Sequence, residues 1–215
     1  KVAEARDRGL PAFAETCPQY LYLSLEDIGK PGFEGAKYVF SPPVREKWHQ
    51  EKLWAGLQKD DLQVVSTDHC SFNFNGQKDF GKNDFTKIPS GGPGIENRMQ
   101  LLFEGGVNSG RFSVNRWIEL TSTAPAKLFG MYPDKGTIEI GADADIVIWD
   151  PNQEHTISSR THHMNVDYSL YEGMKIKGNT ETVISRGEII IQNDQFIGKA
   201  GRGKFIKRNK FNYKF

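Results

Sequence analysis

The spacing of apolar positions predicts alternating helices and strands over the first 130 residues. Apolar side chains recur three and four residues apart in residues 44–58 and 95–103, as on one face of a helix. Short apolar runs that end in a polar residue or proline predict strands instead. The expected elements are a helix over 1–8, strands over 12–16 and 38–41, a helix over 44–58, a strand ending at Asp68, a helix over 95–103, and helices beginning after Ser113 and at Pro125. This alternation is typical of a parallel α/β layer.

Beyond residue 130 the pattern changes to short strands separated by turns. Four runs rich in Ile and Val predict strands over residues 137–140, 144–149, 182–185 and 188–191. Glycines, an Arg-Gly pair and an Asn-Asp pair stand between these runs and predict the turns. The second part of the chain is therefore expected to form a separate β unit.

Composition excludes several classes of protein. The 215 residues are 37% hydrophobic and 12% aromatic, which is sufficient for a core, and the formal net charge of +1 does not indicate a nucleic-acid partner. No apolar run is long enough to span a bilayer. Two cysteines, Cys17 and Cys70, do not make a disulfide framework. They predict a reducing, cytoplasmic location, and both are expected to be small buried side chains.

The first candidate for chemistry is Asp68. It follows the short apolar run of Val64 and Val65, as a side chain does when the carboxyl end of a buried strand delivers it to a site. A carboxylate there is costly to bury unless a cation or a hydrogen-bond donor is present. The alternative is that Asp68 caps the following turn, a common role for aspartate. The residues alone leave both interpretations open.

Motifs spread along the whole chain carry a family resemblance. They are residues 15–20 (ETCPQY), 41–43 (SPP), 66–72 (STDHCSF), 84–89 (DFTKIP), 135–138 (KGTI), 141–147 (GADADIV), 161–163 (THH), 171–174 (YEGM) and 185–187 (SRG). The chain resembles the C-terminal part of a dihydropyrimidinase or D-hydantoinase, cyclic amidases of the metal-dependent amidohydrolase superfamily. The GADAD block is typical of the whole superfamily, whereas residues 66–72 together with 84–89 are specific to a much smaller group of proteins.

The resemblance implies an α/β fold: the C-terminal portion of a (β/α)8 TIM barrel, followed by the C-terminal strands of a β-sandwich. Residues 1–130 would supply the last two barrel strands and their helices, 131–198 the sandwich strands, and 199–215 a basic tail that contacts another subunit. Two of eight strands cannot close a barrel. The chain is therefore expected to be a fragment, inactive alone, of a protein about twice as long.

The resemblance also implies a reaction and its residues. The family hydrolyses the ring amide of dihydropyrimidines or 5-substituted hydantoins to N-carbamoyl amino acids, with two zinc ions that activate water. Asp68 would bind one zinc ion, accept the proton of the attacking hydroxide and return it to the departing ring nitrogen. Ser41 and Ser90 would bind the ureide edge, Ser90 through its main-chain carbonyl, although many members have Asn there. The structural alternative for both serines is ordinary turn chemistry beside Pro and Gly.

The remaining zinc ligands are not evident in this sequence. The family uses four histidines and a bridging carbamylated lysine, and these are expected upstream of this chain's first residue. None of the five histidines forms a His-x-His pair, and His69 is expected to point away from Asp68. The adjacent His162 and His163 are interpreted as packing or interface residues.

Two alternative functions are considered, and the resemblance also implies binding partners. A non-catalytic dihydropyrimidinase-like scaffold protein of the cytoskeleton would keep the fold without the metal ligands. An allantoinase or dihydroorotase is disfavoured by the loop at residues 84–89. The partners implied are a small cyclic ureide and further copies of the subunit, as a homotetramer or homodimer, with neither nucleic acid nor membrane.

Overall fold

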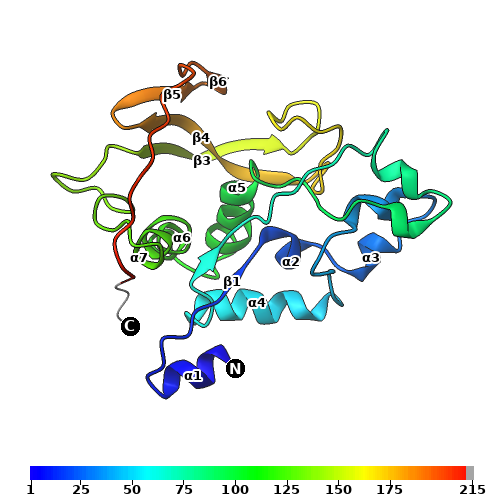
Figure 1. The fold of residues 1–215 in the computed structure, drawn as a ribbon, viewed down its shortest axis with the longest axis horizontal. Coiled ribbons are helices and arrows are strands. Elements are labelled where there is room, and N and C mark those ends of the chain that lie inside the picture. The colour runs from blue at the N-terminus through cyan, green and yellow to red at the C-terminus, as the bar shows by residue number, and fades with distance from the viewer. Residues whose placement is uncertain (212–215) are drawn as a thin grey trace.

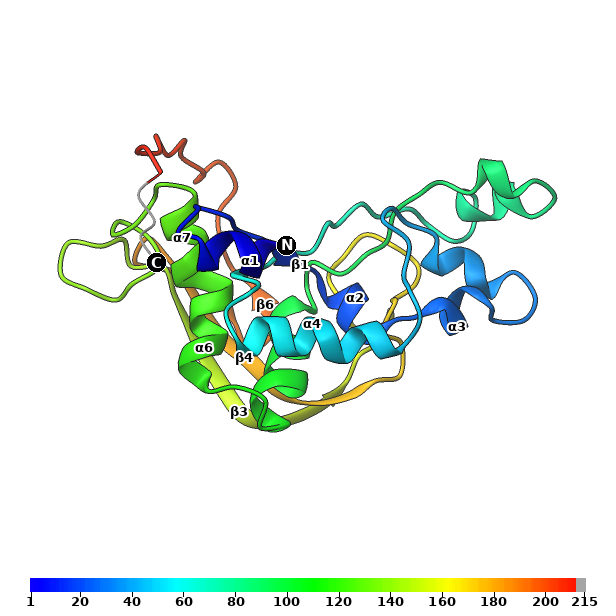
Figure 2. The same ribbon diagram turned by 90° about the horizontal axis from the view of Figure 1, so that it is seen from below.

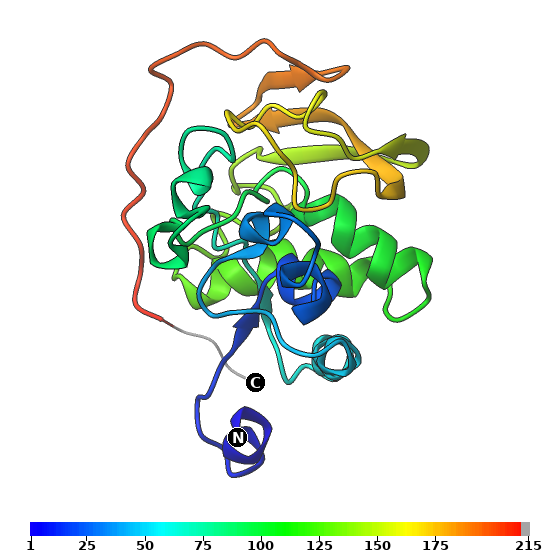
Figure 3. The same cartoon turned by 90° about the vertical axis from the view of Figure 1, so that its right-hand side faces the viewer.

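An antiparallel sheet lies across a layer of helices (Figure 1). The computed structural model describes residues 1–211. The sheet has the strand order β3-β4-β5-β6, so that β3 and β6 form its edges. Its strands are β3 (Ile146–Thr156), β4 (Lys175–Ser185), β5 (Glu188–Gln192) and β6 (Gln195–Phe196). The helices α5 (Arg98–Leu102), α6 (Val114–Ile118) and α7 (Ala124–Leu128) lie directly under this sheet, and α4 (Trp48–Gln58) lies farther from it (Figures 1 and 3).

A parallel pair of strands stands at the centre of the N-terminal part. Strand β1 (Glu15–Thr16) pairs with β2 (Val64–Val65), and Glu15 lies opposite Val64. Ser66 N donates to Thr16 O at 2.9 Å, which continues the ladder past β2. The helix α4 (Trp48–Gln58) lies between the two strands in the chain. The predicted parallel α/β layer is thus present, with strands shorter than predicted.

The remaining N-terminal elements are short. They are α1 (Val2–Asp7), α2 (Pro18–Tyr22), α3 (Leu25–Ile28) and the 3-10 helices η1 (Glu34–Tyr38), η2 (Lys78–Gly81) and η3 (Phe85–Lys87). The predicted strand over 38–41 is wrong, because Tyr38 ends η1 and the next residues are irregular. The predicted helix over 44–58 begins only at Trp48, because residues 43–46 are irregular. Figure 2 shows the loop that carries η2 and η3 on the same side of the molecule as α3.

Two longer helices cross under the sheet, and each contains π-helical turns. Helix α5 (Arg98–Leu102) continues as the π-helical segment η4 (Phe103–Asn108). Helix α6 (Val114–Ile118) continues through η5 (Glu119–Thr123) into α7 (Ala124–Leu128). Ser113 Oγ accepts from Arg116 N at 3.2 Å, which confirms the predicted N-cap. The short helix predicted to start at Pro125 is confirmed to within one residue as α7, which begins at Ala124, and the π-helical turn η5 joins it to α6.

The turns of the β unit lie where the sequence predicts them. The pairs Arg186-Gly187 and Asn193-Asp194 have positive φ angles and connect β4 to β5 and β5 to β6. The run at 137–140 is not a strand, and its Ile138 side chain is 80% exposed. No strand within residues 1–211 pairs with it.

Aromatic side chains join the sheet to the helices. Trp149 of β3 lies with its ring centroid 4.9 Å from that of Trp117 and 5.2 Å from that of Phe103. Trp54 of α4 is buried in the same cluster, whereas Trp48 is 62% exposed. Stacked and edge-to-face rings of this kind stabilise a core beyond their area burial. The cluster therefore fixes the sheet on the helical layer.

The C-terminal segment returns from the sheet to the helices (Figure 3). Asn209 N donates to Gly130 O at 2.8 Å, and the rings of Phe211 and Phe13 lie 5.4 Å apart. The described part of the predicted basic tail thus contacts its own chain, and residues 212–215 lie outside the described residues.

Arg116 connects α6 to the loop between α4 and β2. Its guanidinium donates to Leu57 O at 3.0 Å, to Leu62 O at 3.1 Å, to Asp60 Oδ1 at 2.8 Å and to Glu119 Oε2 at 2.7 Å. Its side chain is only 13% exposed, so these contacts are largely shielded from water. Because this loop leads directly into β2, Arg116 sets where β2 begins.

We expect Arg116→Met in the complete protein to lower the free energy of unfolding by about 2–4 kcal/mol. The substitution leaves the Leu57 and Leu62 carbonyls without their guanidinium donor and removes one of the two arginines that pair with Asp60, the other being Arg6. Urea unfolding followed by circular dichroism measures the change. The matched control is Arg8→Met, at an exposed arginine, for which a change within about 0.5 kcal/mol is expected. Equal effects of the two substitutions would contradict the role given to Arg116.

Candidate active site

The three predicted site residues line one cavity. Ser41, Asp68 and Ser90 surround a space of about 190 Å³. The other lining residues are Gln19, Phe40, Cys70, Gly91, Gly92 and Leu170. Three separate segments of the chain thus bring the three predicted residues to one place. Turn chemistry alone does not require such convergence.

The segment at residues 89–92 lies between the two other site segments. Gly91 N donates to Val39 O at 3.0 Å on one side. Cys70 N donates to Gly92 O at 3.3 Å on the other, where His69 and Gly92 form a parallel bridge. Ser90 therefore stands between the backbone of Ser41 and the backbone of Asp68.

Asp68 stands beyond the carboxyl end of β2. Its φ of 47° lies in the left-handed region, which is uncommon for a non-glycine residue. Gln19 Nε2 donates to Thr67 O at 3.1 Å and steadies the backbone immediately before it. The carboxylate is exposed, and no backbone N–H within residues 1–211 donates to it. The turn-capping interpretation of Asp68 is therefore wrong.

His69 points away from the cavity, as predicted. Its Nδ1 accepts from Gly94 N at 3.2 Å and from Ile95 N at 3.4 Å, so the ring proton is placed on Nε2. His69 does not line the cavity that Asp68 lines. It anchors the chain that follows Ser90 rather than contributing to the space.

The two cysteines differ in environment. Cys17 is buried as predicted, its Sγ lies 3.1 Å from Ser66 Oγ, and burial raises the pKa of its thiol. Cys70 is exposed and lines the cavity, so the prediction of burial is wrong for this residue. It follows Asp68 by two positions and lies at the same strand end, where the chain leaves the core.

The described residues do not form a complete metal site. Within residues 1–211, no group of three or more His, Cys, Asp or Glu side chains is placed to hold a metal ion. His163 Nδ1 lies 2.9 Å from Glu96 Oε1, a hydrogen bond that raises the pKa of its imidazole. His162 and His163 are not among the residues that line the cavity of Asp68. Asp68 fits one oxygen-ligand position of a metal site, and the rest of a ligand set is not found in this part of the molecule.

Two residues at or near the cavity were not predicted from the sequence. Gln19 lines it, and its position inside the motif at 15–20 is the signal that could have indicated a role. Lys78 is fully buried under the segments of Ser41 and Ser90. A lysine in a polar loop is normally solvated, so no pattern in the sequence indicated its burial.

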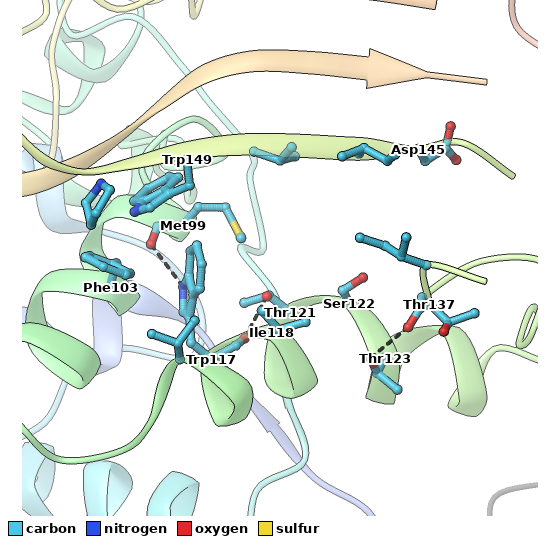
Figure 4. A pocket seen from close by; sticks show the side chains of 16 residues that line it. Met99, Phe103, Trp117, Ile118, Thr121, Ser122, Thr123, Thr137, Asp145 and Trp149 are labelled. Atoms are coloured by element: carbon cyan, nitrogen blue, oxygen red, sulfur yellow. Dashed lines mark hydrogen bonds between the residues drawn. The ribbon is translucent and has the colours of Figure 1, made fainter. Parts of the chain in front are cut away.

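A larger groove lies elsewhere, between α6 and β3 (Figure 4). It measures about 640 Å³, and apolar side chains such as Trp117, Ile118 and Val147 line it. Its one carboxylate, Asp145, is already paired with Lys135. An apolar groove beside an edge strand suits packing better than chemistry. The smaller cavity around Asp68 is therefore the candidate active site.

No helix in the described part of the chain has the length and apolar character needed to cross a membrane.

The chain is similar in sequence to known amidohydrolases. The sequence profile described as "Amidohydrolase family" matches residues 45–190. The chain is 55% identical to a D-hydantoinase of Geobacillus stearothermophilus over 211 residues, which is 98% of this chain and 45% of the relative. It is also 55% identical to a D-hydantoinase of Streptomyces coelicolor over 213 residues, or 99% of this chain and 45% of that relative. The chain thus spans less than half the length of these curated relatives.

The fold is also similar to that of solved structures. A crystal structure of dihydropyrimidinase from Brevibacillus agri NCHU1002 superposes with a TM-score of 0.97 at 55% identity. The match covers 99% of this chain and 46% of that one. The α/β arrangement described above is therefore closely similar to the shared part of that structure.

We expect Gly91→Ala in the complete protein to lower the free energy of unfolding by about 1–3 kcal/mol. A Cβ on Gly91 would fall 2.1 Å from Cys70 O and 3.1 Å from its carbonyl carbon, so the 89–92 segment must move away from Cys70. Thermal unfolding measures the loss. The matched control is Gly203→Ala, where a Cβ meets no atom within 4 Å. Unchanged stability in Gly91→Ala would show that the packing of this segment is looser than described.

Proposed function

The chain belongs to the amidohydrolase family, and from that premise we propose that it supplies the C-terminal part of a cyclic amidase. The reaction is hydrolysis of the ring amide bond of dihydropyrimidines or 5-substituted hydantoins, with N-carbamoyl amino acids as products. The observation that carries the proposal is the convergence of Ser41, Asp68 and Ser90 on one cavity. The identity of about half the residues to D-hydantoinases supports the substrate class.

The proposed architecture is a barrel portion followed by a sandwich portion. Residues 1–130 are the last part of a (β/α)8 barrel, and 131–198 are the C-terminal share of a β-sandwich. The parallel pairing of β1 with β2 supports the first assignment, because barrel strands are parallel and carry active sites at their carboxyl ends. The antiparallel sheet β3–β6 supports the second.

Asp68 is the proposed proton carrier. An exposed carboxylate with no partner among residues 1–211 is free to accept a proton from attacking water and to return it to the ring nitrogen as the C–N bond breaks. Balance is kept because the proton lost by water is the one that neutralises the departing nitrogen. The left-handed backbone at Asp68 turns the chain at this point.

Ser41 and Ser90 are the proposed contacts to the ureide edge. A cyclic ureide presents alternating N–H donors and carbonyl acceptors along one edge of the ring. Ser41 offers a backbone N–H and a hydroxyl, and the Ser90 carbonyl offers an acceptor. Together they orient the ring with its scissile carbonyl toward Asp68. Because the Ser90 contact uses the main chain, it does not depend on a particular side chain at that position.

Zinc is the proposed cofactor, as two ions per subunit bridged by a carbamylated lysine that lies outside this chain. When bound, zinc acidifies water and polarises the scissile carbonyl. Asp68 is the one ligand assigned to residues 1–211, and its carboxylate oxygen is a suitable donor.

The assembly and location are also proposed by family likeness. The protein is expected to form a homotetramer or homodimer in the cytoplasm, with the basic tail of residues 199–215 contributing to a subunit contact. In residues 199–211 this tail is largely exposed, which leaves surface for such a contact.

We expect Asp68→Ala in the complete, zinc-loaded protein to reduce ring opening by at least on the order of 10³-fold, because both the proton carrier and a ligand are lost. The fold survives, since Asp68 is exposed. Hydrolysis of dihydrouracil and a 5-substituted hydantoin, followed by ultraviolet absorbance, measures the rate. Asp134→Ala, at an exposed aspartate away from the cavity, is the matched control. Near-normal turnover in Asp68→Ala would refute its assigned role.

Metal analysis separates the enzyme from a non-catalytic scaffold. For the complete protein, we expect about two zinc ions per subunit by plasma emission spectrometry, with activity lost on chelation and restored by zinc. A metal-free protein that leaves every cyclic ureide intact would favour the scaffold. Turnover of allantoin or dihydroorotate in place of dihydrouracil and hydantoins would move the substrate assignment to a neighbouring amidohydrolase.

A further inference from the structure

Lys78 occupies an unusual position beneath the candidate active site. It lies in η2, inside the long loop at residues 71–94, and its exposed fraction is 0%. Its Nζ donates to Val39 O at 3.1 Å and to Pro89 O at 2.9 Å. Both acceptors are main-chain carbonyls, so the contacts depend on the backbone path and not on side chains.

The two carbonyls belong to the segments that carry the serines. Val39 precedes Ser41 by two residues, and Pro89 directly precedes Ser90. Val39 O also accepts from Gly91 N at 3.0 Å, so the ammonium and the Gly91 amide share one acceptor. Lys78 and this amide together tie the two segments at their closest approach. Lys78 therefore contributes, together with the Gly91 amide, to the separation of Ser41 from Ser90.

The burial of Lys78 costs folding free energy, so stability does not explain its position. Burying an ammonium is unfavourable unless it is paired, and no carboxylate within residues 1–211 lies within ion-pair distance of it. Consistent with this cost, burial lowers the pKa of Lys78 to about 8. An apolar side chain of similar length would fill the same space without this penalty. What it could not do is donate hydrogen bonds to both carbonyls.

The loop that presents Lys78 is itself held firmly. Lys78 N donates to Asn73 O at 3.0 Å, and Phe74 N donates to Asp167 Oδ1 at 2.6 Å, which anchors the loop to the region before β4. At the other end of η2, a Cβ on Gly81 would fall 2.1 Å from Ile88 Cγ1. The lysine thus projects from a backbone with little freedom.

We propose that Lys78 is a positioning residue that holds the Ser41 and Ser90 backbones at the separation required to bind the edge of a cyclic ureide. This inference rests on the proposed function, because it takes those two serines as substrate contacts. Lys78 does not line the cavity and so does not touch the substrate. Its effect is on the geometry of binding, where small displacements are costly.

The test is Lys78→Met in the complete, zinc-loaded enzyme. Methionine keeps the length and much of the volume but removes the N–H donors. We expect KM for dihydrouracil and for a 5-substituted hydantoin to rise on the order of ten- to a hundred-fold, with a smaller fall in kcat and unchanged zinc content. We also expect the Gly91 amide to exchange with solvent faster, because its acceptor segment is released. The matched control is Lys82→Met, at an exposed lysine four residues away. It should change neither KM nor the exchange rate of the Gly91 amide.

The outcomes separate positioning from structural roles. A lower melting temperature with KM unchanged would mean that Lys78 only stabilises the loop, and it would overturn the proposal. Lys78→Gln provides a second variant of smaller volume, with the same expected rise in KM. Recovery of both variants only as unfolded protein would assign Lys78 to folding and also overturn it. If the unsubstituted enzyme opens neither ring, the proposed function itself fails. If the unsubstituted enzyme opens the rings and Lys78→Met has the same KM, only the positioning role fails.

Discussion

The candidate site depends on one constraint: the segment at residues 89–92 is hydrogen-bonded on both sides. Gly91 N donates to Val39 O at 3.0 Å, and Gly92 O accepts from Cys70 N at 3.3 Å. Backbone groups that leave the solvent must find partners, so this middle segment cannot move without breaking bonds to both neighbours. A glycine at position 91 is required because a Cβ would collide with Cys70 O. The three site residues are neighbours because these backbones are.

The rest of the fold places the two outer segments. The Arg116 guanidinium holds the loop before β2, and Gln19 holds the backbone just after it through Thr67 O. The Trp117 and Trp149 rings lock the helical layer to the sheet. Lys78 then joins the Ser41 segment to the Ser90 segment from beneath. A rigid support of this kind is what a site needs if it is to orient a small planar ring that offers few contacts of its own.

Prediction from the sequence succeeded where structure is decided locally. The turns at 186–187 and 193–194 and the cap at Ser113 were predicted from a few neighbouring residues, because φ preferences and side-chain caps act over that range. Prediction failed where the structure of a segment depends on another segment that must pair with it. The Ile-rich run at 137–140 has strand composition but no strand beside it within residues 1–211. For the site, Asp68, Ser41 and Ser90 came from motifs, and their convergence in one cavity followed only in the structure.

By itself, the sequence determined the family, the parallel character of the first part, and which polar residues stand at strand ends, because these depend on residue identity and order along the chain. Tertiary structure alone decided that the Asp68 carboxylate is free, that Cys70 is exposed, and that Lys78 is buried under two carbonyls. These facts are properties of contacts between segments that lie tens of residues apart. A local pattern cannot encode them, because burial and hydrogen bonding are set by whichever segment arrives from elsewhere in the chain.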